Sequence, residues 1–224
     1  MAGIWGVGRY VDGQGRSHAW PVGTEELERD RLVADRWLEA VGLGRGDRCC
    51  VVSMLSEAAQ TWPLVLAALL RGVQLSFADA TAAEAPRLQV LLGTLAHDAV
   101  VGVTDELVGA LGTLGALDHL LAVPLVVARP AAFAGLGAAG RVVHRMALVG
   151  PALALGDEPG GAAACDAGEW ALDTEGEQVT VTSVAPRRHP VRHLATAIRG
   201  RVVDGHRVVP EPTGPDLARP GVVR

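Results

Sequence analysis

The chain has 224 residues with 20 basic and 25 acidic side chains, a formal net charge of −5, and 49% hydrophobic residues. The acidic balance argues against a nucleic-acid partner, because phosphates attract a basic face. All basic residues are arginine, and the absence of lysine excludes Schiff-base catalysis, a pyridoxal-phosphate anchor and a phosphate-loop lysine.

The first forty residues predict a two-stranded ribbon followed by a helix. Glycines in residues 5–20 flank the pair Asp12-Gly13, which is typical of a hairpin turn. Thr24 predicts a helix N-cap, and the acidic residues after it favour the positive end of the helix dipole. Apolar residues then recur at near-helical spacing until Gly42 ends the helix.

The next ninety residues alternate between predicted strands and predicted helices. The apolar runs expected to be strands are Arg48–Met54, Val73–Phe77, Ala99–Val103 and Leu120–Val127. The helices between them begin near Ser56, Ala82 and Thr104. This alternation predicts right-handed βαβ units and a parallel sheet covered by helices on both faces. Trp37 and Trp62, on predicted helices, are expected in the core.

After Pro130 the sequence changes character. Residues 146–155 are apolar, residues 157–168 indicate a connection, and residues 169–184 alternate around Gly176 as in a hairpin. A basic helix is expected from Pro186, followed by a proline-rich tail. The fold class is therefore α/β, a parallel sheet flanked by helices with a small β-rich segment near the C-terminus. Residues 1–185 are predicted to form one α/β domain, and residues 186–224 the basic helix and tail.

The cysteines and the longest apolar runs indicate a cytoplasmic protein. Cys49, Cys50 and Cys165 form neither an even disulfide framework nor a metal-ligand spacing, so buried, reduced thiols are expected. No run of 18 uncharged apolar residues occurs, and no secretory signal pattern is present, so no membrane partner is expected.

Charge is distributed unevenly along the chain. Acidic residues concentrate early, between Glu25 and Asp30, whereas residues 187–207 are basic. The basic stretch has two interpretations, an anion-binding patch or a solvated surface.

Residues 41–52, which read VGLGRGDRCCVV, resemble the turn into the first parallel strand of adenylate-forming enzymes, the acyl-CoA synthetases and ligases. The resemblance continues through the closing Gly72 of the next helix, the strand ending at Asp79 and the corner Thr104-Asp105. It implies the first half of an acyl-CoA synthetase-like N-terminal domain.

Residues 179–193 are similar to the part of that family that cradles the phosphates of ATP. Thr182 and Ser183 resemble the opening of the phosphate loop, and residues 191–193 its close. Between them the family's glycines and lysine are replaced by VAPRRHP, in which two prolines lack an N–H donor. The resemblance makes Thr182, Ser183, Arg187 and Arg188 the candidate cofactor-binding residues, for ATP or AMP.

The resemblance implies a catalytically degenerate protein that has an accessory or regulatory role or binds a small acyl or nucleotide ligand. The alternative hypothesis is that the protein is the active half of a split ligase, whose partner chain supplies the missing glutamate, aspartate and lysine. A third hypothesis is a scaffold that binds no ligand. A protein partner or a homodimer is expected at an apolar face that the missing half would cover. No metal site is expected, because Pro190 lies between His189 and His193 and arginines surround them. No catalytic residue is assigned.

Overall fold

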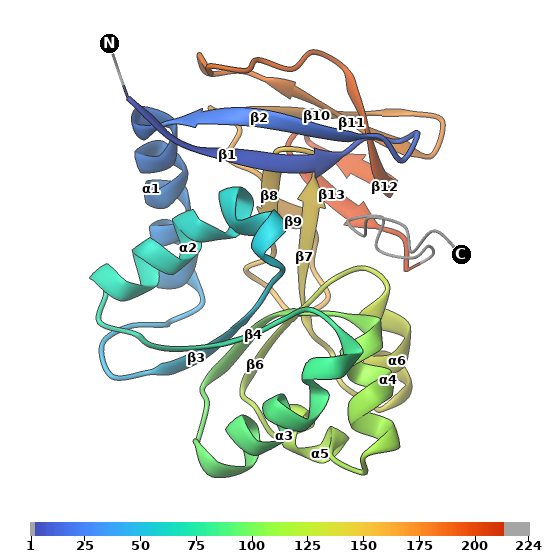
Figure 1. Ribbon diagram of the computed structural model, residues 1–224. Coiled ribbons are helices and arrows are strands. Elements are labelled where there is room, and N and C mark those ends of the chain that lie inside the picture. Colours follow the sequence, from blue (N-terminus) through green and yellow to red (C-terminus); the bar gives the residue numbers. More distant parts are fainter. Residues whose placement is uncertain (1–2, 213–224) are drawn as a thin grey trace.

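The computed structural model describes residues 3–212, and its largest feature is an 11-stranded sheet that runs through the whole molecule (Figure 1). Five neighbouring strands at one end are parallel. In sheet order these are β4 (Gln74–Ala78), β3 (Arg48–Val52), β5 (Ala99–Val103), β6 (Leu125–Ala128) and β7 (His144–Val149). The predicted parallel sheet is therefore confirmed.

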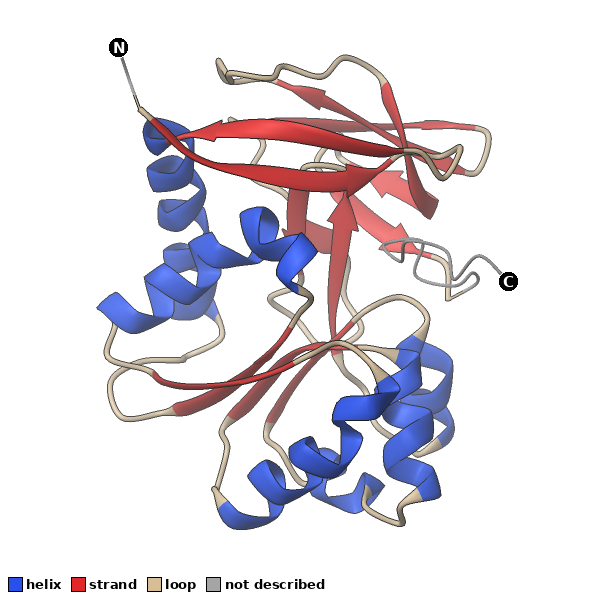
Figure 2. Ribbon diagram, in the orientation of Figure 1, coloured by secondary structure: helices blue, strands red, loops and turns tan. Residues whose placement is uncertain are grey.

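Helices cover both faces of the parallel strands (Figure 2). One face is covered by α1 (Thr24–Ala40) and α2 (Ala58–Leu70). The other is covered by α3 (Ala85–Thr94), α4 (Asp105–Thr113), α5 (Leu117–Leu121) and α6 (Ala132–Ala138). Two short 3-10 turns, Leu55–Glu57 and Ala82–Glu84, lead into α2 and α3. Cys49 packs against the hydrophobic core on the α1 and α2 face of the sheet, and Cys50 against the core on the opposite face. Adjacent residues of a strand point to opposite faces of the sheet. All three cysteines are buried and free, as expected.

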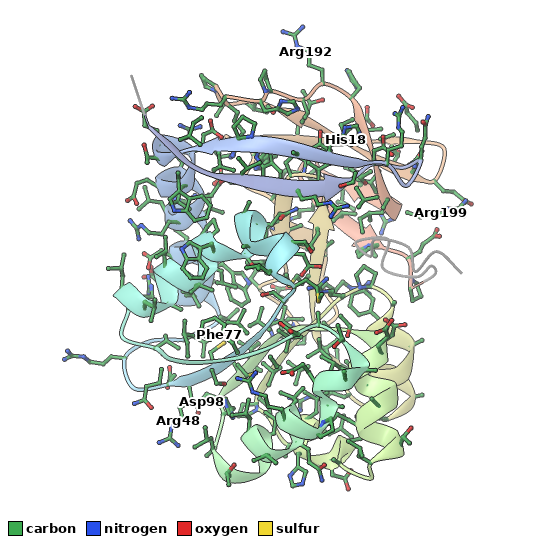
Figure 3. All side chains as sticks on the ribbon, in the orientation of Figure 1. His18, Arg48, Phe77, Asp98, Arg192 and Arg199 are labelled. Carbon is green, nitrogen blue, oxygen red and sulfur yellow. The ribbon has the colours of Figure 1, made fainter. Side chains whose placement is uncertain are left out.

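The turn that carries the sequence resemblance has a clear local cause. The carboxylate Oδ2 of Asp47 accepts the N–H of Gly44 at 2.7 Å, and Gly46 has φ of +94°, which favours glycine. One residue later, the N–H of Arg48 donates to Oδ2 of Asp98 at 2.8 Å, joining the starts of two strands (Figure 3). These contacts fix where the first parallel strand begins.

From β7 onward the sheet is antiparallel. Its strands are β8 (Ala152–Leu155), β9 (Ala163–Ala164), β10 (Trp170–Glu175), β11 (Gln178–Ser183), β12 (Leu194–Val203) and β13 (Arg207–Pro210). The predicted hairpin around Gly176 is confirmed, with that glycine at φ +63°.

The N-terminal ribbon is also confirmed, as β1 (Ile4–Val11) paired antiparallel with β2 (Ser17–Gly23). It crosses in front of the β-rich part of the molecule in Figure 1. Its turn is tied to β12 by a bridge between Asp12 and Thr196 and by the N–H of Gly13, which donates to the carbonyl of Ala195 at 2.9 Å.

Three predictions about elements are wrong. The basic helix from Pro186 is a loop followed by β12 and β13, because Val202, Val208 and their neighbours pair across strands of the sheet. The boundary at residue 185 stays a prediction, and residues 213–224 of the proline-rich tail lie outside the described residues. The run Leu120–Val127 is the end of α5 and then β6, separated by a short turn. Thr24 is the first helical residue, and Gly23 is the N-cap.

The two tryptophans expected in the core have different positions. Trp37 is buried and its indole Nε1 donates to the carbonyl of Gly156 at 3.0 Å. Trp62 is 39% exposed, so that prediction is wrong. Trp62 lies on the solvent-exposed side of α2 with Leu69 and Leu70. Because α2 carries apolar residues around most of its circumference, the spacing of apolar residues in the sequence does not show which side of the helix is buried.

Within residues 3–212, no helix combines the length and the apolar character that crossing a membrane requires.

Candidate functional site

The candidate phosphate loop, residues 184–190, connects β11 to the start of β12 and is closed by its own hydroxyl groups. The N–H of Ser183 donates to the carbonyl of Val191 at 2.9 Å, and the N–H of Val191 donates to Oγ of Ser183 at 3.0 Å. The N–H of His193 donates to Oγ1 of Thr182, also at 3.0 Å. Thr182 and Ser183 therefore do come together at the mouth of the loop, where both oxygens accept bonds from the loop itself.

Arg187 turns inward from this loop. Its guanidinium donates two hydrogen bonds to the carboxylate of Asp30 on α1, from Nη2 to Oδ1 at 2.6 Å and from Nη1 to Oδ2 at 3.0 Å. Nη2 also donates to Oε2 of Glu169 at 2.8 Å, and the guanidinium carbon lies 4.0 Å from the centre of the Trp170 ring. Only 2% of the Arg187 side chain is exposed. We call Arg187, Asp30, Glu169 and Trp170 the Arg187 cluster.

The positive charge of Arg187 is balanced by carboxylates within the cluster. Burial disfavours the charged guanidinium, but the hydrogen bonds and charge of Asp30, with the charges of Glu169 and Glu26, outweigh burial and raise the pKa of Arg187. Its positive charge is thus permanent and already matched by two carboxylates. Such a charge has little attraction left for a phosphate.

The residues on either side of Arg187 are also bound to α1. The carbonyl of Pro186 accepts from Nη2 of Arg29 at 2.8 Å, and Nε of Arg29 donates to Oε1 of Glu169 at 2.6 Å. The N–H of Arg188 donates to Oε1 of Glu26 at 2.6 Å. Three consecutive loop residues are therefore fastened to one helix. The Arg188 side chain is exposed.

Several backbone N–H groups in and beside the loop already have acceptors within the protein. A phosphate nest needs several backbone N–H groups turned toward one point. Here the N–H groups of Val184, Arg188, Val191 and His193 donate to Glu169, Glu26, Ser183 and Thr182 respectively. The two prolines supply none. These four N–H groups therefore hold the loop in place.

Metal and nucleophile chemistry find little support around the loop. His189 and His193 are exposed, and among residues 3–212 no three His, Cys, Asp or Glu side chains gather closely enough to hold a metal ion. Burial raises the pKa of the Cys49 and Cys165 thiols to about 12, so neither is a thiolate at neutral pH.

Sequence reasoning missed Glu26, Asp30 and Glu169, the carboxylates that hold the loop. A signal was present in the opposite charges of residues 25–30 and residues 187–207. Taken separately, the acidic stretch predicts a helix N-terminus, and the basic stretch predicts an anion-binding patch or a solvated surface. Read together, the two charges predict mutual contact, which Arg187 and Asp30 make.

No protein-family model matches the sequence, and no curated protein matches it. Solved structures do match. A 2-hydroxyisobutyryl-CoA ligase in the postadenylation state, in complex with R3-HIB-AMP, superposes with a TM-score of 0.68 at 15% identity, over 93% of this chain and 51% of that chain. The anthranilate CoA ligase AuaEII, in complex with anthranoyl-AMP, gives 0.62 at 15% identity, over 92% and 46%.

The N-terminal subdomain of NpsA from Klebsiella oxytoca, in complex with 3-hydroxyanthranilyl-AMSN, matches with a TM-score of 0.56 at 14% identity, over 91% of this chain and 57% of that chain. These similarities show the fold, which is that of the N-terminal part of adenylate-forming acyl-CoA ligases. The chain spans about half the length of the ligases that it matches.

Proposed function

We propose that this protein is a non-catalytic relative of the adenylate-forming acyl-CoA ligases, with an accessory or regulatory role instead of adenylation. The observation that carries the proposal is the Arg187 cluster. In the loop that resembles the family's phosphate loop, the guanidinium of Arg187 and the N–H of Arg188 donate to carboxylates of α1.

Phosphate binding by Arg187 would require large rearrangement. The guanidinium would have to leave Asp30 and Glu169, and the partly buried carboxylate of Asp30 would then lose its positive partner, whereas Glu169 would keep Arg29. Removing one partner from a buried ion pair costs about 3–5 kcal/mol. Of the two candidate arginines, Arg188 is the exposed one and forms no such buried ion pair.

Calorimetric titration with ATP-Mg²⁺, AMP and a non-hydrolysable acyl-AMP analogue tests the proposal. We expect no binding heat from the unmodified protein. Arg188→Ala removes the available guanidinium, and Arg192→Ala is the matched control, because Arg192 points away from the molecule (Figure 3). Nucleotide binding that is lost in Arg188→Ala and kept in Arg192→Ala would contradict the proposal.

The alternative function is one half of a split ligase. It is favoured by the match to about half of each ligase chain. In this alternative a second chain supplies the glutamate, aspartate and lysine that act on the nucleotide. The nucleotide titration separates the two functions, since a half that keeps the phosphate loop in use should bind ATP or AMP.

A protein partner or a second copy is part of both functions. Exposed large apolar side chains include Leu69 and Leu70 at the end of α2 and Phe77 on β4, the strand at the edge of the sheet (Figure 3). We expect light scattering to report twice the mass of one chain, and Phe77→Glu to yield monomers. Val90→Glu, at an exposed position on α3, is the control. A monomeric unmodified protein would remove the homodimer and leave a separate partner.

A further inference from the structure

The 11-stranded sheet ends in two edge strands that are protected differently, β10 at one end and β4 at the other. β10 carries the exposed acidic residues Asp173 and Glu175, and the N–H of Leu172 donates to the carbonyl of Gly205, in the turn after β12, at 2.7 Å. Charged side chains and a covering segment are devices that keep an edge strand from pairing with another chain. Within residues 3–212, β4 has neither device.

The backbone of β4 presents a free set of hydrogen-bonding groups. Its sequence, QLSFA, contains no charged residue and no proline, and it pairs with β3 in an unbroken parallel register. The N–H of Gln74 and the carbonyl of Ala78 bond on the β3 side, at 2.8 and 3.1 Å. Because successive residues of a strand point their backbone groups to opposite sides, those of Leu75 and Phe77 face away from β3. No strand in the described part of the chain pairs with them.

One face of this free edge is apolar. Leu75 packs against the hydrophobic core on the α1 and α2 face, and Phe77, two positions further along the strand, projects to the same face. Phe77 is 42% exposed, and Leu69 and Leu70, which end α2 just before β4, are 53% and 72% exposed. Pairing with another apolar strand would bury part of this surface and satisfy the free backbone groups.

The two ends of β4 carry unmatched charges of opposite sign. The exposed side chain of Arg45 lies against Gly72, just before the strand, and the exposed Asp79 follows the strand directly. Neither forms an ion pair within residues 3–212. The carboxylates of Asp47 and Asp98, also at the amino end of the parallel strands, each accept a backbone N–H. An antiparallel strand with the same end charges would therefore match both free charges of β4.

We propose that β4 pairs antiparallel with β4 of a second copy of this chain, about a two-fold axis at Ser76. In this register Leu75 lies opposite Phe77 of the second copy, and the outward N–H and C=O groups of the two residues bond to each other. Arg45 of each copy then lies beside Asp79 of the other. A parallel pair would place like charges together. The inference rests on the second copy in the proposed function and names the surface that binds it.

Charge reversal tests the pairing, with the dissociation constant of the dimer measured by sedimentation equilibrium. Arg45→Glu or Asp79→Arg should weaken association at least about ten-fold, because like charges then meet at both ends of the paired strands. The double variant Arg45→Glu/Asp79→Arg should restore association to within about three-fold of the unmodified protein. Arg192→Glu, on a side chain that points away from the molecule, is the matched control and should change nothing (Figure 3).

Both reversed positions are exposed in the monomer, so unfolding at low protein concentration should be the same in all four variants and confirms that each is folded. A dimer that ignores the single reversals, or that the double variant fails to restore, would refute the β4 pairing and leave a homodimer through another surface. A protein that stays monomeric at every concentration would refute it as well. Nucleotide binding would count against the non-catalytic role alone, so the two failures are distinguishable.

Amide exchange followed by NMR locates the interface directly. Well above the dissociation constant, the N–H groups of Leu75 and Phe77 should be protected, and dilution below that constant should remove their protection. The N–H of Ser76 points toward β3 and should stay protected at both concentrations, which makes it the internal control. Fast exchange of Leu75 and Phe77 in the dimer would show that β4 is unpaired and overturn the proposal.

Discussion

Arg187 and Asp30, 157 positions apart in the sequence, form a two-pronged ion pair with N–O distances of 2.6 and 3.0 Å. The pair joins the loop after β11 to the first helix, and Glu169 and the ring of Trp170 complete its surroundings. A side chain that could have been a phosphate ligand is here a structural link between the two ends of the domain.

The first prediction concerns the stability that the Arg187 cluster supplies. Arg187→Met should lower the free energy of unfolding by about 3–5 kcal/mol, because Asp30 would lose its positive partner and Glu169 one of its two, Arg29 being the other. Urea unfolding of Arg187→Met and of the exposed Arg192→Met measures the difference. A loss below 1 kcal/mol, or an equal loss in both variants, would show that the cluster is not a structural link.

A second prediction concerns pH. Burial would raise the pKa of Asp12, but hydrogen bonds from His18, from the backbone and side chain of Arg16 and from the N–H of Gln14 outweigh it and hold that pKa well below its usual range. A depressed pKa contributes stability that is present above the unfolded value, near pH 4, and is lost as the pH falls toward the folded value.

Asp12→Asn should therefore lower the free energy of unfolding by about 2 kcal/mol at pH 7. The difference from the unmodified protein should shrink as the pH falls below about 4. Denaturant unfolding at pH 7 and at pH 3 measures it, with Asp79→Asn, at an exposed position, as control. A difference that stays constant with pH would contradict the ionic role of Asp12.

A third prediction concerns Gly102 in the middle of the parallel sheet. It has φ of +95°, and a Cβ placed there would lie 2.2 Å from the carbonyl oxygen of Val52 on the neighbouring strand. Both the strained backbone and the clash oppose any side chain. Gly102→Ala should lower the free energy of unfolding by more than 3 kcal/mol, on the order of the largest single-substitution effects.

The control for that substitution is Gly109→Ala. Gly109 lies within α4 with open space around the position of a Cβ, so alanine should raise stability by up to about 1 kcal/mol. Thermal unfolding of both variants gives opposite signs if the backbone at Gly102 is as described. A neutral Gly102→Ala would mean that the strand has another path there.

A fourth prediction concerns thiol reactivity. Burial raises the pKa of Cys49 and Cys165 to about 12, and burial also raises that of Cys50. At pH 8 iodoacetamide should leave all three thiols of the native protein unmodified for hours. In guanidinium at about 6 M, which unfolds most domains, it should alkylate all three within minutes. Intact-mass spectrometry counts the adducts. Rapid native modification of one cysteine would identify an exposed, activated thiol.

Much of the fold could be predicted from the sequence because its determinants are local. Gly46 and Asp47 set the turn before the first parallel strand, Asp12-Gly13 the ribbon and Gly176 the hairpin. Each of these needs only a few neighbouring residues. The alternation of apolar runs and helical spacing then specified the parallel sheet, because a strand buried on both faces has to be apolar throughout.

The candidate site was predicted only in part. Thr182 and Ser183 lie at the end of β11, beside the loop, and their binding of a cofactor stays a prediction. The inward turn of Arg187 was not predictable in the same way. Whether an arginine faces solvent or a carboxylate depends on Asp30 and Glu169, which approach it only when α1 and the hairpin pack together.

The sequence by itself therefore determined the class of fold and the alternation of strands and helices along the chain. Tertiary structure alone decided that residues 194–210 are strands, that Trp62 is exposed, and that β4 lies at the edge of the sheet. The physical reason is the separation along the chain of the residues that interact. Turns and periodicity come from neighbours along the chain, whereas pairing, burial and charge matching come from residues that only folding brings together.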